Sequence, residues 1–381
     1  MFKYTLASAL SLAALATASC GHAQTAQNAP AAAAELPFTV TERGKFNQPW
    51  AMAFEPGTSR LFVTLQKGGI TFLDTANGQV GTVTGAPAVD FGGQGGMGEI
   101  KFAPDYATSK AVYLTWAEAG DNDTRGAVLG RGILSCATAT ACAIGGLTVI
   151  WRQTPKVTGR GHFSHRIAFS PDGKYLFLSS GERQQGAPAQ DLSVNLGKVL
   201  RLNLDGTPAA GNPFADRGGV SAQIWSYGHR NLLGLKFDAK GQLWDLEHGP
   251  RGGDELNLVE RGVNYGWPVV SNGINYDGSD IPPHRTKPEF RAPAISWNPV
   301  IAPGDFIFYS GKLWPQWKGN VLATGLGSNA LVRVTLNGAK GAEAQRWAMG
   351  KRMREIVEAP DGSIWIAEDG ANARLVQLKP R

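Results

Sequence analysis

The feature that most constrains the fold of this 381-residue chain is a hairpin pattern that recurs along it. Each copy reads as a short strand, a turn of Pro, Asp and Gly residues, and an apolar strand that ends in polar or Gly residues. The copies are spaced by about 50 to 70 residues, which is the period of a propeller blade with insertions. They begin at Ala53, Lys101, Ala168, Lys236, Phe306 and Glu358, and the copy at Phe306 is the loosest.

Six copies predict an all-β fold, a single six-bladed β-propeller over residues 37–381. A β-sandwich is the alternative all-β fold, but it would not repeat one hairpin six times. Polar and Gly residues follow the second strand of several copies, at residues 66–68, 181–184, 248–250 and 368–370. Loops that leave equivalent strands of a propeller gather at one end of its channel, so we expect these segments to build one pocket.

Residues 224–268 pack Gly, Trp, His and charged side chains most densely between short apolar runs. After a predicted strand, the loop at 248–255 carries three glycines, whose carbonyls can turn toward a ligand or cation because no Cβ blocks the approach. Asp254 and Glu255 then supply hard oxygen ligands that suit Ca²⁺. The alternative is a Gly-rich surface loop whose carboxylates are solvated.

The N-terminus reads as a targeting segment. A basic start and an apolar stretch at residues 6–18 predict a secretory signal peptide over residues 1–23, which implies a periplasmic protein without an integral membrane segment after cleavage. Residues 24–36 are Ala-rich and predicted to be disordered. Cys20 leaves lipid anchoring open as an alternative, although Thr17 stands where such a cleavage box normally has Leu.

Composition excludes some classes of function. Charged residues make up 18% of the chain and Gly numbers 49, which suits a turn-rich all-β enzyme. The net charge of +6 comes without a long Lys/Arg run, so we expect no nucleic-acid partner, although a mild positive field suits an anionic cofactor. In an exported protein, Cys136 and Cys142 are expected to form a disulfide that closes a small loop. A metal site there is disfavoured, since no further ligand has suitable spacing.

Four short motifs then occur in order: GHRN at 228–231, HGP at 248–250, DELN at 254–257 and NYGWP at 264–268. This combination resembles the soluble PQQ-dependent sugar dehydrogenases, in particular the periplasmic aldose sugar dehydrogenases. The resemblance covers about residues 39 to 378. It implies a six-bladed propeller with pyrroloquinoline quinone (PQQ) near the axis and Ca²⁺ bound to that cofactor.

The resemblance also implies a catalytic base. Oxidation of an alcohol by hydride transfer needs a group that takes the hydroxyl proton, and a neutral imidazole suits that role. In the family this His lies nine residues before the Pro of the following turn, which selects His162 rather than His165 when counted from Pro171. Some glucose-oxidising members have Asp directly before this His, where this chain has Gly161, so the pKa of the base and the preferred sugar stay open.

Cofactor contacts carry over in the same way. Gln94 lies in a Gly-rich loop like one that the family places beside cofactor and substrate, and Arg230 and Asn231 would contact the quinone oxygens. Residues two apart in a strand face the same side, so Arg352 and Arg354 can direct both guanidinium groups at one anion. The alternative is a solvated basic strand edge. In the family frame, the two would bind carboxylates of the cofactor.

Two calcium sites follow from the resemblance. Gly249 and Pro250 would give backbone carbonyls to the calcium that contacts the cofactor. Glu255 and Tyr265 would belong to a separate structural calcium site, the Tyr through its backbone carbonyl. One departure concerns the cofactor: relatives place a Lys in a Leu-Lys pair that contacts it, and Gly327 stands at that position here. One cationic contact is therefore lost.

The chain is accordingly expected to be an exported oxidoreductase that passes a hydride from an aldose sugar, or a related alcohol, to the quinone. An external electron acceptor is required, because no haem-attachment CxxCH motif occurs. Two alternatives stay open. One is a calcium-dependent propeller lactonase or other hydrolase, and the other is a non-catalytic carbohydrate- or partner-binding propeller that has lost its cofactor.

Overall fold

The computed structural model describes residues 36–381, and the regular secondary structure of this part of the chain is almost all β-strand, with only short helices. The predicted signal peptide, Cys20 and the Ala-rich segment as far as Glu35 lie outside the described residues. No helix among the described residues is long and apolar enough to cross a membrane. The helices are α1 (Tyr106–Ser109) and the 3-10 turns η1 (Ala187–Gln190), η2 (Ala215–Arg217), η3 (Gly219–Gln223), η4 (His284–Thr286) and η5 (Pro315–Trp317).

All of the predicted hairpins form, each as an antiparallel pair of neighbouring strands. The pairs are β2 (Pro49–Phe54) with β3 (Arg60–Leu65), β6 (Met97–Phe102) with β7 (Ala111–Ala119), β10 (Ser164–Phe169) with β11 (Tyr175–Ser180), β14 (Asn231–Phe237) with β15 (Leu243–His248), β18 (Pro303–Phe308) with β19 (Val321–Gly325), and β22 (Met353–Glu358) with β23 (Ile364–Glu368). The repeat read from the sequence is therefore confirmed.

Outer strands extend every hairpin into a larger sheet. Four sheets have four strands each, in the orders β10-β11-β12-β13, β14-β15-β16-β17, β18-β19-β20-β21 and β1-β24-β23-β22. The outer strands are β1 (Phe38–Phe46), β4 (Ile70–Asp74), β5 (Val80–Thr84), β8 (Arg125–Cys136), β9 (Ala141–Arg152), β12 (Lys198–Asn203), β13 (Ile224–Tyr227), β16 (Asp254–Val259), β17 (Ile295–Trp297), β20 (Ala330–Asn337), β21 (Lys340–Ala348) and β24 (Ala373–Pro380).

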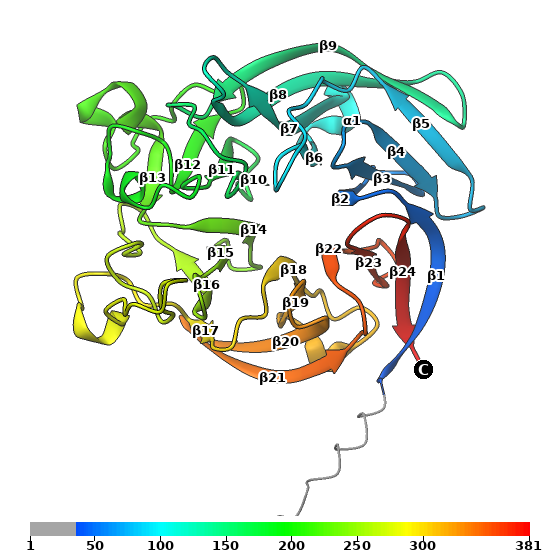
Figure 1. Cartoon of the computed structure of the whole chain (residues 1–381). Helices are drawn as coiled ribbons and strands as arrows, with labels where there is room; N and C mark the ends of the chain where they lie inside the picture. The colour runs from blue at the N-terminus through cyan, green and yellow to red at the C-terminus, as the bar shows by residue number, and fades with distance from the viewer. Residues whose placement is uncertain (1–35) are drawn as a thin grey trace, which may run out of the picture. The chain divides into compact units, whose positions relative to one another are not determined.

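The sheets of residues 36–381 are arranged around a common centre (Figure 1). The first strands of the hairpins contact one another in the cyclic order β2, β6, β10, β14, β18, β22 and back to β2. The ring is fastened by β1, which pairs along its length with the C-terminal β24 and so completes the sheet that contains β22. Because the first strand pairs with the last, the two ends of the described chain are joined within one sheet.

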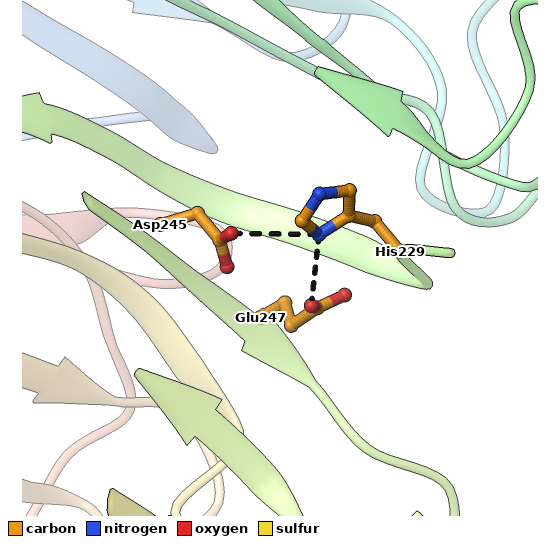
Figure 2. Close-up of side chains that lie close together, drawn as sticks. All are labelled: His229, Asp245 and Glu247. Carbon is orange, nitrogen blue, oxygen red and sulfur yellow. Dashed lines mark hydrogen bonds and ion pairs between the residues drawn. The ribbon is translucent and has the colours of Figure 1, made fainter. Parts of the chain in front are cut away.

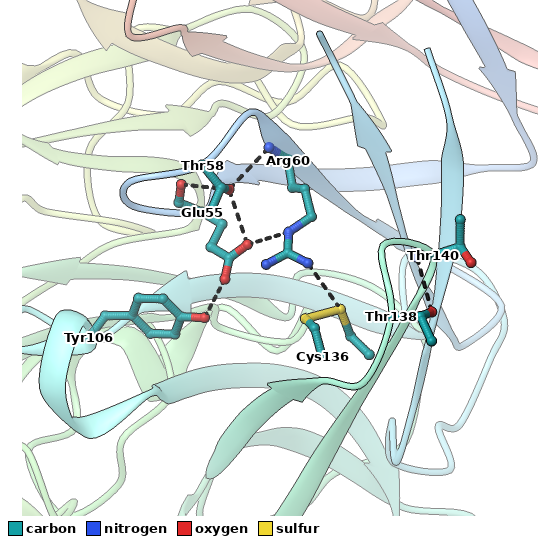
Figure 3. The surroundings of a disulfide bond; sticks show 8 residues. Glu55, Thr58, Arg60, Tyr106, Cys136, Thr138 and Thr140 are labelled. Carbon is teal, nitrogen blue, oxygen red and sulfur yellow. Dashed lines mark hydrogen bonds and ion pairs between the residues drawn. A yellow bond between two sulfur atoms is a disulfide. The ribbon is translucent and has the colours of Figure 1, made fainter. Parts of the chain in front are cut away.

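The remaining sheet differs from the expectation of separate blades, because it has eight strands in the order β2-β3-β4-β5-β9-β8-β7-β6. Its two antiparallel halves are joined by a parallel pairing of β5 with β9, from Thr82 opposite Ala141 to Thr84 opposite Ala143. The predicted disulfide between Cys136 and Cys142 is confirmed at the adjacent turn (Figure 3).

Apolar side chains fill the space between neighbouring sheets. Tyr113 of β7 meets Phe169 of β10 edge to face at 5.2 Å between ring centroids. Trp244 of β15 likewise meets Phe308 of β18 at 6.1 Å. Burial of such large rings supplies most of the adhesion between sheets.

The innermost strands all share one irregularity, a shift of register close to their first residues. The shifts lie between Pro49 and Met52, Met97 and Ile100, Ser164 and Ile167, Leu232 and Gly234, Pro303 and Phe306, and Met353 and Glu355. A β-bulge bends a strand and redirects its side chains. Trp50, Glu99 and His165 all lie in such segments, so the same distortion places a different side chain at each position around the centre.

Arg166 of β10 connects these segments and is fully buried. Its Nη1 lies 2.7 Å from Glu355 of β22 and 3.3 Å from Glu99 of β6. Its Nη2 donates to the Gly304 carbonyl of β18 at 3.0 Å, and its guanidinium lies 4.2 Å from the ring centroid of Trp50 in β2. One side chain thus contacts four other innermost strands.

We predict that Arg166→Met lowers the free energy of unfolding by about 3–5 kcal/mol, because it leaves Glu99 and Glu355 buried without their cation. Denaturant unfolding monitored by tryptophan fluorescence measures this. Arg152→Met is the matched control: its partner Glu118 is 27% exposed and Arg152 itself 52% exposed, so the expected loss is below about 1 kcal/mol. Equal losses in the two variants would contradict a central role for Arg166.

Candidate functional site

A cavity of about 320 Å³ lies where the strand-end segments meet. Gln66, His248, Asp369 and Gly370 all line it, so three of the four segments predicted to converge do so. The complete lining is Gln48, Trp50, Gln66, Gly93, Gln94, Phe163, Ser164, His165, Asn231, Leu233, His248, Leu326, Arg352, Arg354, Asp369 and Gly370.

His162 forms a pair with a carboxylate from the fourth segment. Its Nδ1 contacts Glu182, and both side chains are almost fully buried. Burial lowers the pKa of His162, and the hydrogen bond with Glu182 opposes that shift only in part. Burial raises the pKa of Glu182, but the bond with His162 and the charge there lower it overall. A neutral imidazole beside an ionised carboxylate is the state of a general base.

This pair bears on Gly161, which stands where the resemblance implies an Asp in some members. A Cβ on Gly161 would lie 2.3 Å from Oε1 of Gln184, so a larger residue there would displace that side chain. Glu182, on the loop after β11, brings a carboxylate to the imidazole from a different part of the chain. Among the described residues no group hydrogen-bonds Nε2 of His162, which leaves that nitrogen free to accept a proton.

His165, the competing histidine, lines the cavity, whereas His162 is not among its lining residues. The His165 ring stacks on Trp50 with 4.9 Å between centroids, and its Nδ1 lies 3.1 Å from the Thr115 hydroxyl. Burial, with a smaller contribution from Arg166, lowers its pKa to about 3. His165 is therefore a much weaker base and forms part of the cavity wall.

Two predicted cofactor residues, Gln94 and Asn231, line the cavity and bond to the segment that carries His162. Gln94 lines the cavity, and its Oε1 accepts a hydrogen bond from the His162 backbone N–H at 2.7 Å. Asn231 also lines it and is 1% exposed. Its Oδ1 accepts a bond from Ser164, but the buried Nδ2 has no partner. A buried amide donor without an acceptor is costly, so it indicates a ligand oxygen in the cavity.

Arg352 and Arg354 converge as predicted, although only Arg354 belongs to β22, and it lies within the register shift of that strand. Both line the cavity, and both donate to the carboxylate of Asp369, at 2.9 Å from Arg352 and 2.9 and 3.0 Å from Arg354. Burial raises the pKa of Asp369, but the charge of Arg354 and the bonds with both arginines lower it overall. Two cations share one anion, which leaves a net positive charge for a carboxylate ligand.

Gly327 stands where the resemblance implies a lysine that contacts the cofactor. A Cβ at this position would lie 3.0 Å from the Ala302 Cβ, a tight contact. The preceding Leu326 lines the cavity, and its carbonyl accepts a hydrogen bond from Nη1 of Arg352 at 3.2 Å. Arg352 therefore brings a positive charge next to the place where relatives carry a lysine.

Arg230 is 5% exposed and directly precedes Asn231, but it lines a separate small cavity and not the 320 Å³ one. Its backbone N–H donates to Glu247 Oε2 at 2.6 Å, and its Nη1 donates to the His248 carbonyl at 3.2 Å. Its Nη2 donates to the Tyr276 hydroxyl at 3.2 Å. The buried Nε has no partner, so Arg230 keeps one donor for a ligand.

A buried cluster of His229, Asp245 and Glu247 adjoins Arg230 in the chain, and Figure 2 shows its three side chains. Nδ1 of His229 lies 3.2 Å from Glu247 and 3.4 Å from Asp245, and Nε2 lies 2.8 Å from the Ser226 hydroxyl. The ligand atoms of the three ionisable side chains lie within 4.8 Å of one another, close enough to share a small cation. Because Glu247 also accepts from the Arg230 backbone, the cluster fixes the position of Arg230.

The residues predicted for structural calcium lie together. Glu255 and Tyr265 line a second cavity of about 10 Å³, room for about one water-sized sphere. Glu255 faces Glu247 across the β15–β16 pairing, and burial followed by the charge of Glu247 raises the pKa of Glu255 well above its usual range. The Tyr265 carbonyl accepts a bond from His284 at 3.1 Å. Two opposed buried carboxylates fit a Ca²⁺ ion, which would offset their repulsion.

Gly249, predicted for the cofactor calcium, lines this same small cavity, so the two expected calcium sites lie close to each other. A Cβ on Gly249 would lie 2.3 Å from the carbonyl oxygens of Gly252 and Gly253, so this position requires glycine. Pro250 is buried beside it but lines neither cavity.

Sequence reasoning missed three residues of the site: Glu182, Asp369 and Trp50. Glu182 and Asp369 stand in strand-end segments that were expected to converge, so their position along the repeat was a usable signal. Their partners were not predictable, because His162 comes from another loop and Arg354 from strand β22. Trp50 precedes the first hairpin copy and had no motif around it.

Comparisons with known proteins agree with this geometry. The profile of the family described as "Glucose / Sorbosone dehydrogenase" matches residues 46–377. Aldose sugar dehydrogenase YliI of Escherichia coli (strain K12) is 36% identical over 345 residues, which cover 88% of this chain and 91% of that protein.

Solved structures give the same result. A crystal structure of glucose dehydrogenase, 36% identical, superposes with a TM-score of 0.84 and covers 89% of this chain and 99% of its own. The PQQ-bound form of aldose sugar dehydrogenase from Streptomyces coelicolor, 28% identical, gives a TM-score of 0.74 and covers 90% of this chain and 98% of its own. The chain therefore belongs to the glucose/sorbosone dehydrogenase family, as the order of its motifs predicted.

Proposed function

We propose that this protein is a PQQ-dependent oxidoreductase that oxidises a hydroxyl group of an aldose sugar. One observation carries the proposal: a buried His162–Glu182 pair stands beside a cavity that offers Arg352, Arg354 and an unpartnered amide of Asn231. A base, cationic groups and a free donor are what an anionic quinone and an alcohol substrate require. The PQQ-bound relative and the aldose sugar dehydrogenase relative support the choice of cofactor and substrate.

His162 would act as the general base. Its Nδ1 is held by Glu182, so Nε2 accepts the hydroxyl proton, and burial keeps the ring neutral at pH 7. The Glu182 carboxylate then stabilises the imidazolium that forms. When bound, the quinone would supply the hydride acceptor, with Ca²⁺ acting on it as a Lewis acid.

The remaining predicted residues would hold the cofactor and its metal. Arg352 and Arg354 would bind its carboxylates, and Arg230, Asn231 and Gln94 its remaining polar atoms. Backbone carbonyls of residues 249 and 250 would bind the cofactor calcium. The carboxylate of Glu255 and the carbonyl of residue 265 would bind a second, structural calcium.

We further propose a count of six blades, obtained by dividing the eight-stranded sheet between β5 and β9, where antiparallel pairing gives way to a parallel one. The register shift found in each of the innermost strands supports this division. Export through residues 1–23 would place the enzyme in the periplasm, where an external electron acceptor would reoxidise it.

The experiment that tests the function is reconstitution. Purified protein stripped with a chelator is loaded with PQQ and Ca²⁺, and dye reduction is measured across a panel of aldoses. We expect sugar-dependent dye reduction only with both additions. Hydrolysis of lactones without PQQ would instead indicate a lactonase, and sugar binding without either reaction would indicate a binding module.

We predict that His162→Ala lowers turnover by about 10²- to 10⁴-fold, the usual loss when a general base is removed. PQQ affinity should change much less, because the cationic groups lie elsewhere. His165→Ala should mainly reduce stability, since it removes the ring that stacks on Trp50. Turnover and PQQ titration at saturating Ca²⁺ measure both effects. Normal turnover in His162→Ala, beside an inactive His165→Ala that still binds PQQ, would show that His165 is the base.

The pH dependence gives a second prediction. The rate should fall on the acid side through the pKa of His162, which burial sets below 6.5, because the protonated ring cannot accept a proton. Glu182 raises that pKa, so Glu182→Gln should move the acid limb of kcat/KM to lower pH and lower kcat by roughly 10²-fold or more. Glu118→Gln, which alters a partly exposed ion pair, is the control. If Glu182→Gln leaves the acid limb of kcat/KM unmoved, Glu182 does not raise the pKa of the group that acts as the base.

A further inference from the structure

Exposed aromatic rings are scarce on the described part of the chain. Five large hydrophobic side chains are exposed there, and three of them are aliphatic residues on strands, Val40, Val80 and Ile133. Of the two aromatic ones, Tyr276 is 71% exposed and Phe91 is 40% exposed. An apolar ring left in water is unfavourable, and Tyr276 is the most exposed of these side chains.

Tyr276 is attached directly to the candidate site. Its hydroxyl accepts a hydrogen bond from Arg230, whose guanidinium lies 5.8 Å from the Tyr276 ring centroid and 5.0 Å from that of Trp267. Arg230 also donates to the carbonyl of His248, which lines the 320 Å³ cavity, as does the adjacent Asn231. The polar end of Tyr276 is therefore bonded to a residue that contacts the cavity wall through His248, while most of the Tyr276 side chain faces solvent.

The loop that carries Tyr276 is held in shape. Ile274 bridges both Arg251 and Asp280, and the tip between them is closed by a hydrogen bond from the Asn275 N–H to the Ser279 carbonyl at 2.9 Å. A side-chain bond joins the same two residues at 3.0 Å. An ordered turn presents the ring in one place, which lowers the entropic cost of binding a ligand against it.

The size of the cavity indicates what lies against the ring. A volume of about 320 Å³ is at the lower end for a site that encloses one small organic ligand. A cofactor that fills it leaves the sugar at the mouth, outside the enclosed space. A pyranose has an apolar face of C–H groups, and such a face stacks favourably on the negative face of an aromatic ring.

We infer that Tyr276 is a substrate-positioning residue whose exposed ring stacks against the pyranose ring of an aldose. The bridges of Ile274 and the Asn275–Ser279 bond hold the loop that presents the ring, and the hydroxyl accepts a further bond from Arg230. The inference rests on the proposed function for its substrate class, but it concerns sugar binding and not the oxidation step.

The test distinguishes the role of the Tyr276 ring from that of its hydroxyl, in the full chain loaded with PQQ and Ca²⁺. With glucose as substrate, Tyr276→Ala should raise KM about 5- to 10-fold with kcat within about twofold, because stacking holds the ground state and the transition state alike. Tyr276→Phe keeps the ring, so its KM should stay within about twofold of wild type. Val80→Ala removes another exposed apolar side chain, on β5, and should change neither constant.

Two results would overturn the inference. An unchanged KM in Tyr276→Ala would show that the ring does not touch the sugar. Equal damage in Tyr276→Phe and Tyr276→Ala, with a parallel loss of PQQ affinity, would show that Tyr276 only holds Arg230. Calorimetric binding of glucose makes the test independent of turnover: weaker binding in Tyr276→Ala alone supports the inference even if no oxidation occurs and the proposed function fails. A wild-type chain that binds no aldopyranose would refute both.

Discussion

Arg166 is the charge on which the centre of this protein depends. It is fully buried, and it reaches side chains or carbonyls of four innermost strands besides its own. The remaining innermost strand, β14, joins the same network through Lys236, which pairs with Asp305 of β18 at 2.8 Å. A buried charge must be paired closely, so these contacts fix the spacing of the strands around the centre. The same contacts therefore hold the ring of sheets together and set the position of the cavity that the innermost strands line.

The register shift repeated in the innermost strands determines which side chains line the cavity and which join the buried ion pairs. A regular strand would send alternate residues inward with the same geometry at every position. The shifts redirect single side chains, so Trp50 and His165 come to form a cavity wall while Arg166, one residue further, enters the ion network. Close backbone approach assists this, since a Cβ on Gly98 would lie 2.2 Å from the His165 ring.

Much of the fold could be predicted, because the hairpin repeat is a local pattern whose strands pair with their neighbours in sequence. The merging of two hairpin groups through β5 and β9 was missed, since a parallel pairing between distant outer strands leaves no local signal. In the site, the family resemblance selected His162, Gln94, Asn231, Arg352 and Arg354, and the structure brings all five to or near one cavity. It did not predict Glu182 as the partner of His162, because that contact joins two loops 20 residues apart in the sequence.

The most direct test of a quinone site in this cavity is a binding isotherm for PQQ, measured by equilibrium dialysis on chelator-treated protein in saturating Ca²⁺. We expect saturable binding of one PQQ per chain, weakened at least about tenfold by Arg354→Ala, which removes a cation that lines the cavity. Arg333→Ala, which alters a residue outside the cavity lining, should bind as wild type does. No saturable binding, or equal binding by wild type and Arg354→Ala, would contradict a quinone site between His162, Asn231 and the two arginines.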